Sequence, residues 1–165
     1  MKKIGTILVI ILLNISIANA KEVIHGIDID EVYNNGDWSS KEYIKQLIND
    51  YTLFIELKKQ LNECSTNQSA QTNCIDTITQ KILQNFYTDF TLNWNNYNEF
   101  KKISQKIYSV PYCSDKFSGA GGTMCEIDTE IHISSILNAY AETLLSSLNN
   151  IFSENYPFLQ NYTSN

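Results

Sequence analysis

The chain has 165 residues, with 18 acidic side chains against 12 lysines and no arginine, which gives a formal net charge of −6. An acidic chain without a guanidinium group is a poor candidate for binding nucleic acid or anionic membrane surfaces, because both need clustered positive charge. The length is that of one domain and is sufficient to build a hydrophobic core.

Residues 1–20 have the three-part layout of a secretory signal peptide. Two lysines follow the initial Met, an apolar run comes next, and Ala18-Asn19-Ala20 is a small-residue cleavage site. The run is too short for a comfortable membrane span, and no later stretch is apolar enough to cross a bilayer. Removing the two leader lysines leaves 10 lysines against 18 acidic residues, a net charge of −8. We therefore predict a periplasmic or secreted protein that starts near Lys21.

All four cysteines follow the predicted signal peptide: Cys64, Cys74, Cys113 and Cys125. In an oxidising compartment an even set of cysteines indicates a disulfide framework, here with three possible connectivities. Pairing neighbours in sequence would close two short loops, each stabilising by roughly 3 kcal/mol in the chain-entropy model. Crossed pairing would instead tie the two loops together. The spacing contains no C-x-x-C pair, so we predict no zinc site, and no cofactor is indicated.

The chain from 21 to 38 has a weak pattern, and we expect a weakly ordered segment there, with at most a short strand or one helical turn. Its acidic residues lack the offsets of an EF-hand loop. A helix start follows, because Ser39 can cap the first turn while Glu42, three residues on, completes a capping box. Apolar residues then recur at helical spacing from Ile44 to Leu61, which predicts a helix that ends near Cys64.

A second helical pattern begins around Asn73 and continues to Phe90. The asparagine-rich stretch 93–98 competes with helical hydrogen bonding, so we expect either a break there or a kinked helix that continues through Phe100, Ile103 and Ile107. Pro111 should end this helix.

The last predicted helix starts at Asp128 or Thr129, with Glu130 in its first turn, where a negative charge favours the helix dipole. Pro157 should end it. The tail 157–165 is expected to be loose, unless Phe158 and Tyr162 dock on the helices.

A glycine-rich stretch lies between the last two cysteines and separates the helical patterns. It lacks the lysine and hydroxyl of a phosphate-binding loop, and no strand pattern precedes it. We interpret it as a disulfide-closed surface loop, a suitable place for a partner contact. The residues predicted to contact a partner are Tyr112, Phe117, Gly119, Gly121 and Gly122.

Few residues suggest catalysis. Helix geometry would put Asp128 and His132 one turn apart, with Glu130 between them, but no third metal ligand is indicated. There is no G-x-S-x-G elbow and no H-E-x-x-H pair, so we predict no catalytic residue and no metal site. Aromatic residues near helix ends either cap the core or anchor an interface: Tyr97, Tyr108, Tyr112, Phe117 and Tyr156.

Together these patterns predict an all-α protein, a bundle of three or four helices with two disulfide-closed connections, forming a single domain over 21–165. The favoured function is a non-enzymatic periplasmic protein that occludes a protein partner, such as an immunity-type antagonist of an envelope-targeting toxin. One alternative is a structural or adhesive subunit of a secretion or conjugation apparatus. Another is a small hydrolase that uses Asp128, Glu130 and His132.

Overall fold

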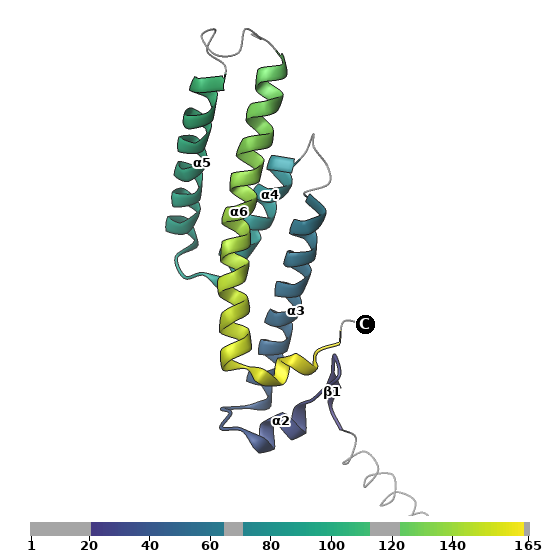
Figure 1. The fold of residues 1–165 in the computed structure, drawn as a ribbon. Coiled ribbons are helices and arrows are strands. Elements are labelled where there is room, and N and C mark those ends of the chain that lie inside the picture. Colours follow the sequence, from purple (N-terminus) through teal and green to yellow (C-terminus); the bar gives the residue numbers. More distant parts are fainter. Residues whose placement is uncertain (1–20, 65–70, 113–122, 164–165) are drawn as a thin grey trace, which may run out of the picture. The chain divides into compact units, whose positions relative to one another are not determined.

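A computed structural model describes residues 21–64, 71–112 and 123–163 (Figure 1). These residues form five α-helices, a short β-hairpin and a 3-10 helix. The predicted all-α class is therefore confirmed. None of the helices in these ranges is long and apolar enough to cross a membrane. The predicted signal peptide, residues 1–20, lies outside the described residues and stays a prediction.

The described residues group into two compact units, and each has a buried core of its own. The terminal unit contains residues 21–50 and 157–163, from the two ends of the described chain, and the helical unit is Tyr51–Tyr156. The boundary falls inside the helix α3 (Lys41–Cys64), so no linker separates the units. The assignment of 21–165 to a single domain stays a prediction.

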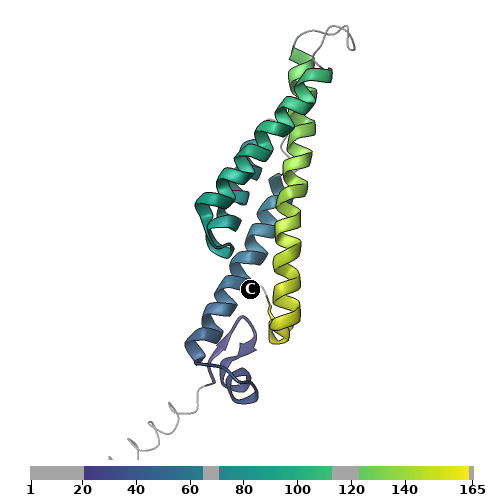
Figure 2. The same cartoon turned by 90° about the vertical axis from the view of Figure 1, so that its left-hand side faces the viewer.

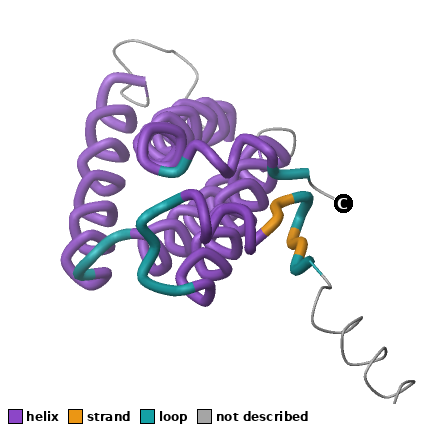
Figure 3. The backbone as a smooth tube through the Cα atoms, turned by 90° about the horizontal axis from the view of Figure 1, so that it is seen from below, coloured by secondary structure: helices purple, strands orange, loops and turns teal. Residues whose placement is uncertain are grey.

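The terminal unit begins with a β-hairpin, shown in orange in Figure 3. Strand β1 (Val23–Ile24) pairs antiparallel with β2 (Ile27–Asp28). The two turn residues, His25 and Gly26, have φ of 49° and 80°, the left-handed values that a two-residue type I′ turn requires.

Helix α2 (Ile29–Asn35) follows the hairpin directly. Asp28 caps it by accepting a hydrogen bond of 3.0 Å from the Glu31 backbone N–H. The short strand or helical turn expected within 21–38 is therefore present, as two short strands and a seven-residue helix. Two-residue strands and a seven-residue helix are too short to leave a periodic pattern in the sequence.

Helix α3 begins as predicted, with a small shift of the cap. The Tyr43 backbone N–H donates to Ser40 Oγ at 3.1 Å, so Ser40 rather than Ser39 is the capping residue. Two lysines in the first turns of α3 join it to the hairpin segment, because Lys45 pairs with Glu22 at 2.8 Å and Lys41 pairs with Asp30. Such exposed ion pairs add little stability, but they favour one arrangement of the segment.

The tail expected to be loose is ordered as far as residue 163. It forms the 3-10 helix η1 (Pro157–Asn161), in which Leu159 is buried. The Phe158 ring meets the Trp38 ring edge-on at 5.4 Å, and Tyr162 lies 5.0 Å from the His25 ring. Both aromatic side chains therefore pack within the terminal unit, against Trp38 and the hairpin residue His25.

The helical unit contains the second half of α3 together with α4 (Gln71–Phe86), α5 (Phe90–Tyr112) and α6 (Thr123–Asn155). Figures 1 and 2 both show α5 alongside α6. The helices are antiparallel, because Phe100 stacks on Tyr140 and Tyr108 stacks on His132, so residue numbers rise along one helix as they fall along the other. An aromatic cluster joins α3 to α6, with Phe54 5.4 Å from Phe152.

Two helix boundaries differ from the sequence-based expectations. The chain breaks between α4 and α5 at residues 87–89, and α5 continues through the asparagines without interruption. Asp89 has a left-handed φ of 55° and its carboxylate accepts from the Leu92 N–H at 3.1 Å, so the N-cap lies before the asparagines. Helix α6 starts at Thr123, before the predicted Asp128, because nothing in 123–128 interrupts a helix. Pro157 lies just beyond the end of α6, as predicted, whereas α5 includes Pro111 and ends one residue later, at Tyr112.

A buried polar contact fixes α5 against α4. Tyr97 is 0 % exposed, and its hydroxyl donates to the Asp76 carboxylate at 2.7 Å, while Lys101 pairs with the other carboxylate oxygen. Burial and the hydrogen bond to Asp76 raise the pKa of Tyr97 well above its ordinary value. The phenol is therefore neutral in the folded protein at neutral pH.

One disulfide, Cys64–Cys74, is present among the described residues, with 5.7 Å between its Cα atoms. It joins the last residue of α3 to the first turn of α4, and it is the pairing of sequence neighbours that the spacing allowed.

Replacing both Cys64 and Cys74 by Ser should lower the free energy of unfolding by about 3 kcal/mol, because the closed loop restricts the unfolded chain. Urea unfolding of the oxidised protein and the double variant measures the difference. A Cys64→Ser, Cys74→Ser variant as stable as the parent would contradict a stabilising role for this bond.

Tyr97→Phe should cost about 1–2 kcal/mol at neutral pH, because Asp76 loses a buried donor. The folded-state pKa of Tyr97 lies above the unfolded value, so the parent loses stability as the pH rises through about 10 and unfolded tyrosines ionise. The difference between parent and variant should therefore shrink above that pH. Tyr140→Phe, which alters the neighbouring ring, is the control. If the free energy of unfolding of both variants changed equally above about pH 10, the pH dependence could not be attributed to Tyr97.

Candidate binding sites

The predicted partner loop cannot be compared with the structure in full. Tyr112 is the last residue of α5, and Cys125 lies in the first turn of α6. The remaining predicted residues lie outside the described ranges: Cys113, Phe117, Gly119, Gly121 and Gly122. A partner contact at this loop stays a prediction.

The hydrolase function that would use the acidic–histidine cluster stays a prediction. Asp128, Glu130 and His132 all lie on the uninterrupted helix α6. Residues two apart on a helix point to different sides, so Glu130 cannot face the other two, whereas Asp128 and His132 remain one turn apart. His132 is exposed and its ring stacks on Tyr108, with 5.7 Å between centroids. In the ranges that the structure covers, no group of three His, Cys, Asp or Glu side chains is placed to hold a metal ion.

The aromatic residues near helix ends divide between the two interpretations. Tyr97 belongs to the core, as its burial and hydrogen bond show. Tyr108 and Tyr156 are half-buried, and each has a ring neighbour on the helical unit, His132 and Phe152 respectively. Neither presents a fully exposed ring, so these two residues mainly extend the core towards the helix ends.

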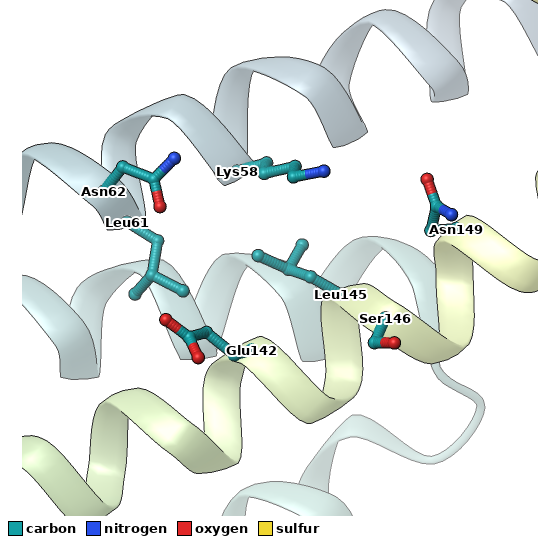
Figure 4. Close-up of a pocket in the computed structure, with 7 residues that line it drawn as sticks. All are labelled: Lys58, Leu61, Asn62, Glu142, Leu145, Ser146 and Asn149. Carbon is teal, nitrogen blue, oxygen red and sulfur yellow. The ribbon is translucent and has the colours of Figure 1, made fainter.

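A shallow polar hollow of about 270 Å³ lies between α3 and α6 (Figure 4). Buried Leu61 and Leu145 form its base. The polar side chains around it are Lys58 and Asn62 from α3 and Glu142, Ser146 and Asn149 from α6. Glu142 already accepts a hydrogen bond of 2.7 Å from Asn138. The hollow offers mixed hydrogen-bonding groups of both charges.

The terminal unit has a second pocket, of about 350 Å³, enclosed by the hairpin, α2 and η1. The indole of Trp38 and the ring of Phe158 form part of its wall, and Asp28 and Glu31 contribute carboxylates. The ammonium of Lys21 lies 2.8 Å from Asp28, and its hydrogen bond, followed by that from the Glu31 backbone, lowers the pKa of Asp28. This aromatic pocket was not foreseen, because its residues come from both ends of the described chain.

Helix α5 exposes three large apolar side chains. Leu92, Ile103 and Ile107 are 55 %, 48 % and 60 % exposed, respectively. Spacings of eleven and four residues place all three on one side of the helix; we call this row the α5 stripe. Lys102 and Lys106, also exposed, adjoin it. The helix continues through Ile103 and Ile107 as one of the two expectations had it, and Tyr97 and Ser104 lie on its buried side.

Comparison with protein-family models, with curated proteins and with solved structures gave no match. The geometry of the two units is therefore the basis for a functional proposal.

We predict a second disulfide, Cys113–Cys125, because the pairing of Cys64 with Cys74 leaves these two cysteines as partners in an oxidising compartment. A non-reducing peptide map of the oxidised chain should contain one linked pair of peptides for each bond. A link from Cys64 or Cys74 to either of the later cysteines would contradict the prediction.

Proposed function

We propose that the protein is an exported, non-enzymatic binding protein that acts by occluding a protein partner, for example as an immunity-type antagonist of an envelope-targeting toxin. We also infer that residues 1–20 are removed on export and that the helical unit is a bundle of three or four helices. The observation that carries the binding proposal is the α5 stripe.

The α5 stripe has the features of a helix that binds in a groove. Ile103 and Ile107 are one turn apart, which is the spacing of neighbouring anchors on an amphipathic helix. Leaving them in water has no benefit for folding, whereas burying them against a partner removes apolar area from solvent. Apolar residues that adjoin one another on a surface indicate an interaction site more often than isolated ones do.

The fold holds this helix rigidly before any partner arrives. Asp89 caps the start of α5, the Asp76–Lys101 pair ties its middle to α4, and ring stacking joins it to α6. Because α5 is already helical, binding requires little ordering of its backbone, and that lowers the entropic cost. Lys102 and Lys106 beside the stripe favour a partner groove with an acidic rim.

The same stripe would also suit a structural subunit that assembles with copies of itself. The two functions differ in stoichiometry: an antagonist forms a defined complex with a different protein, whereas a structural subunit self-associates. Sedimentation of the purified mature chain separates them, because an antagonist should remain a monomer at micromolar concentration.

Ile103→Asp combined with Ile107→Asp should weaken partner binding by roughly 100-fold, as expected when two central apolar anchors are replaced by charges. The experiment captures partners from the envelope and secreted fractions of the source with tagged mature protein, and then measures affinity for the protein recovered. Both positions are exposed, so thermal unfolding should change little.

Ile151→Asp is the matched control, because Ile151 lies on a different helix, α6. Its side chain is 49 % exposed, nearly the same as the 48 % of Ile103. The Ile151→Asp variant should leave the affinity unchanged. Equal binding by the stripe variant and the parent would rule out α5 as the contact surface.

A further inference from the structure

A pocket in the terminal unit joins aromatic rings to carboxylates. The floor and walls include buried Ile27, Val32 and the edge-on pair of Trp38 and Phe158. A volume of about 350 Å³ lies at the lower end of small-molecule sites, which suits a compact ligand or one inserted side chain. The pocket lies wholly within one unit, so its shape depends only on contacts inside that unit.

The two carboxylates at the pocket, Asp28 and Glu31, differ in their hydrogen bonds and ion pairs. Asp28 is occupied, because one oxygen accepts from the Glu31 N–H and the other lies 2.8 Å from the Lys21 ammonium. Glu31 is exposed and interacts electrostatically with the Lys21 ammonium, but among the described residues its carboxylate forms no direct ion pair or hydrogen bond. The pocket therefore combines aromatic walls with one carboxylate that is available to a ligand.

This combination selects a cation. The face of an indole attracts a positive charge through its quadrupole, most strongly among the aromatic side chains, and Glu31 adds direct attraction. An anion would be repelled by the carboxylates, and a purely apolar ligand would desolvate Glu31 without compensation.

The terminal unit already contains a small example of the same chemistry. The Lys41 ammonium lies 5.7 Å from the centre of the Tyr33 ring and pairs with Asp30. An ammonium group is thus held between an aromatic ring and a carboxylate by the chain itself, on the same helix α2 that contributes Glu31 to the pocket. The Lys41 contact therefore supports binding of an ammonium group between an aromatic ring and a carboxylate in the terminal unit.

We propose that the pocket binds a substituted ammonium or guanidinium cation, with its alkyl part against Trp38 and Phe158 and its charge facing Glu31. The proposal does not rest on the α5 stripe, which lies in the other unit. Two sources share this chemistry, a free small cation and a lysine or arginine side chain of a protein.

The indole of Trp38 packs directly against the backbone of Gly36. A Cβ atom added to Gly36 would lie 2.0 Å from Trp38 Nε1, so an alanine there must displace the indole. The backbone of Gly36 is extended, with φ of −133°, and alanine adopts that conformation readily. Gly36→Ala therefore moves the aromatic wall without backbone strain.

The test uses the two tryptophans of the chain, Trp38 and Trp94, as paired reporters in NMR spectra of the indole N–H groups. The probes are tetramethylammonium, Nα-acetyl-lysine amide and, as the neutral isostere, Nα-acetyl-norleucine amide. The two cations should shift the Trp38 signal saturably, the isostere should not, and Trp94 should stay unmoved. Trp38→Leu assigns the signal.

Glu31→Gln should weaken binding of either cation roughly tenfold, as should Gly36→Ala. Glu154→Gln is the control, because Glu154 is an exposed carboxylate on α6 whose loss changes the net charge equally. It should have no effect. Unchanged backbone signals of the hairpin, Val23 to Asp28, show that the terminal unit of each variant is folded.

The two cationic probes distinguish the sources. Tighter binding of tetramethylammonium assigns the pocket to a free cation, and tighter binding of the lysine derivative assigns it to a protein side chain. No saturable shift with either cation, an equal shift with the norleucine isostere, or a Glu31→Gln variant that binds as the parent does would overturn the proposal.

Discussion

The hydrogen bond from the buried Tyr97 hydroxyl to Asp76 determines which side of α5 faces the core. A phenol without a partner would be costly to bury, so the contact favours one rotation of the helix over its neighbours. Tyr97 and Ser104 are turned inwards, and Ile103 and Ile107 are exposed. The polar contact inside the helical unit thus produces the apolar surface outside it, and the same constraint serves stability and the proposed binding.

The elements predicted well from the sequence are those that a local signal defines. Helix α3 has a serine at its cap and a long apolar period, and the structure moves that cap by only one residue, to Ser40. Pro157 ends α6 because a proline resists continuation of the helix in the residue before it. Cysteine spacing allowed the Cys64–Cys74 bond without selecting it, since three connectivities were open.

The features that were missed depend on contacts between distant residues. The hairpin and the tail hold each other in place, because the Thr163 backbone N–H donates a hydrogen bond of 2.9 Å to the His25 carbonyl. Neither segment has a pattern of its own, so no window of sequence could predict both. The aromatic pocket has the same origin, because Trp38 and Phe158 meet only after the tail has docked. The spacing of apolar residues also could not show which side of α5 is buried, because apolar residues lie on both the buried and the exposed side of that helix.

The net charge of the chain does not predict the charge of its individual surfaces. The acidity favours solubility and argues against nucleic acid as a ligand, yet the α5 stripe is flanked by Lys102 and Lys106. In the terminal unit Asp28 and Asp30 form ion pairs with Lys21 and Lys41, whereas Glu31 at the pocket forms no direct ion pair with a described residue and interacts with Lys21 only at longer range. Recognition at short range depends on such individual groups, because water and salt screen the field of the total charge within about 10 Å. A partner is therefore selected by the side chains at each surface, and the overall charge mainly affects how quickly it arrives.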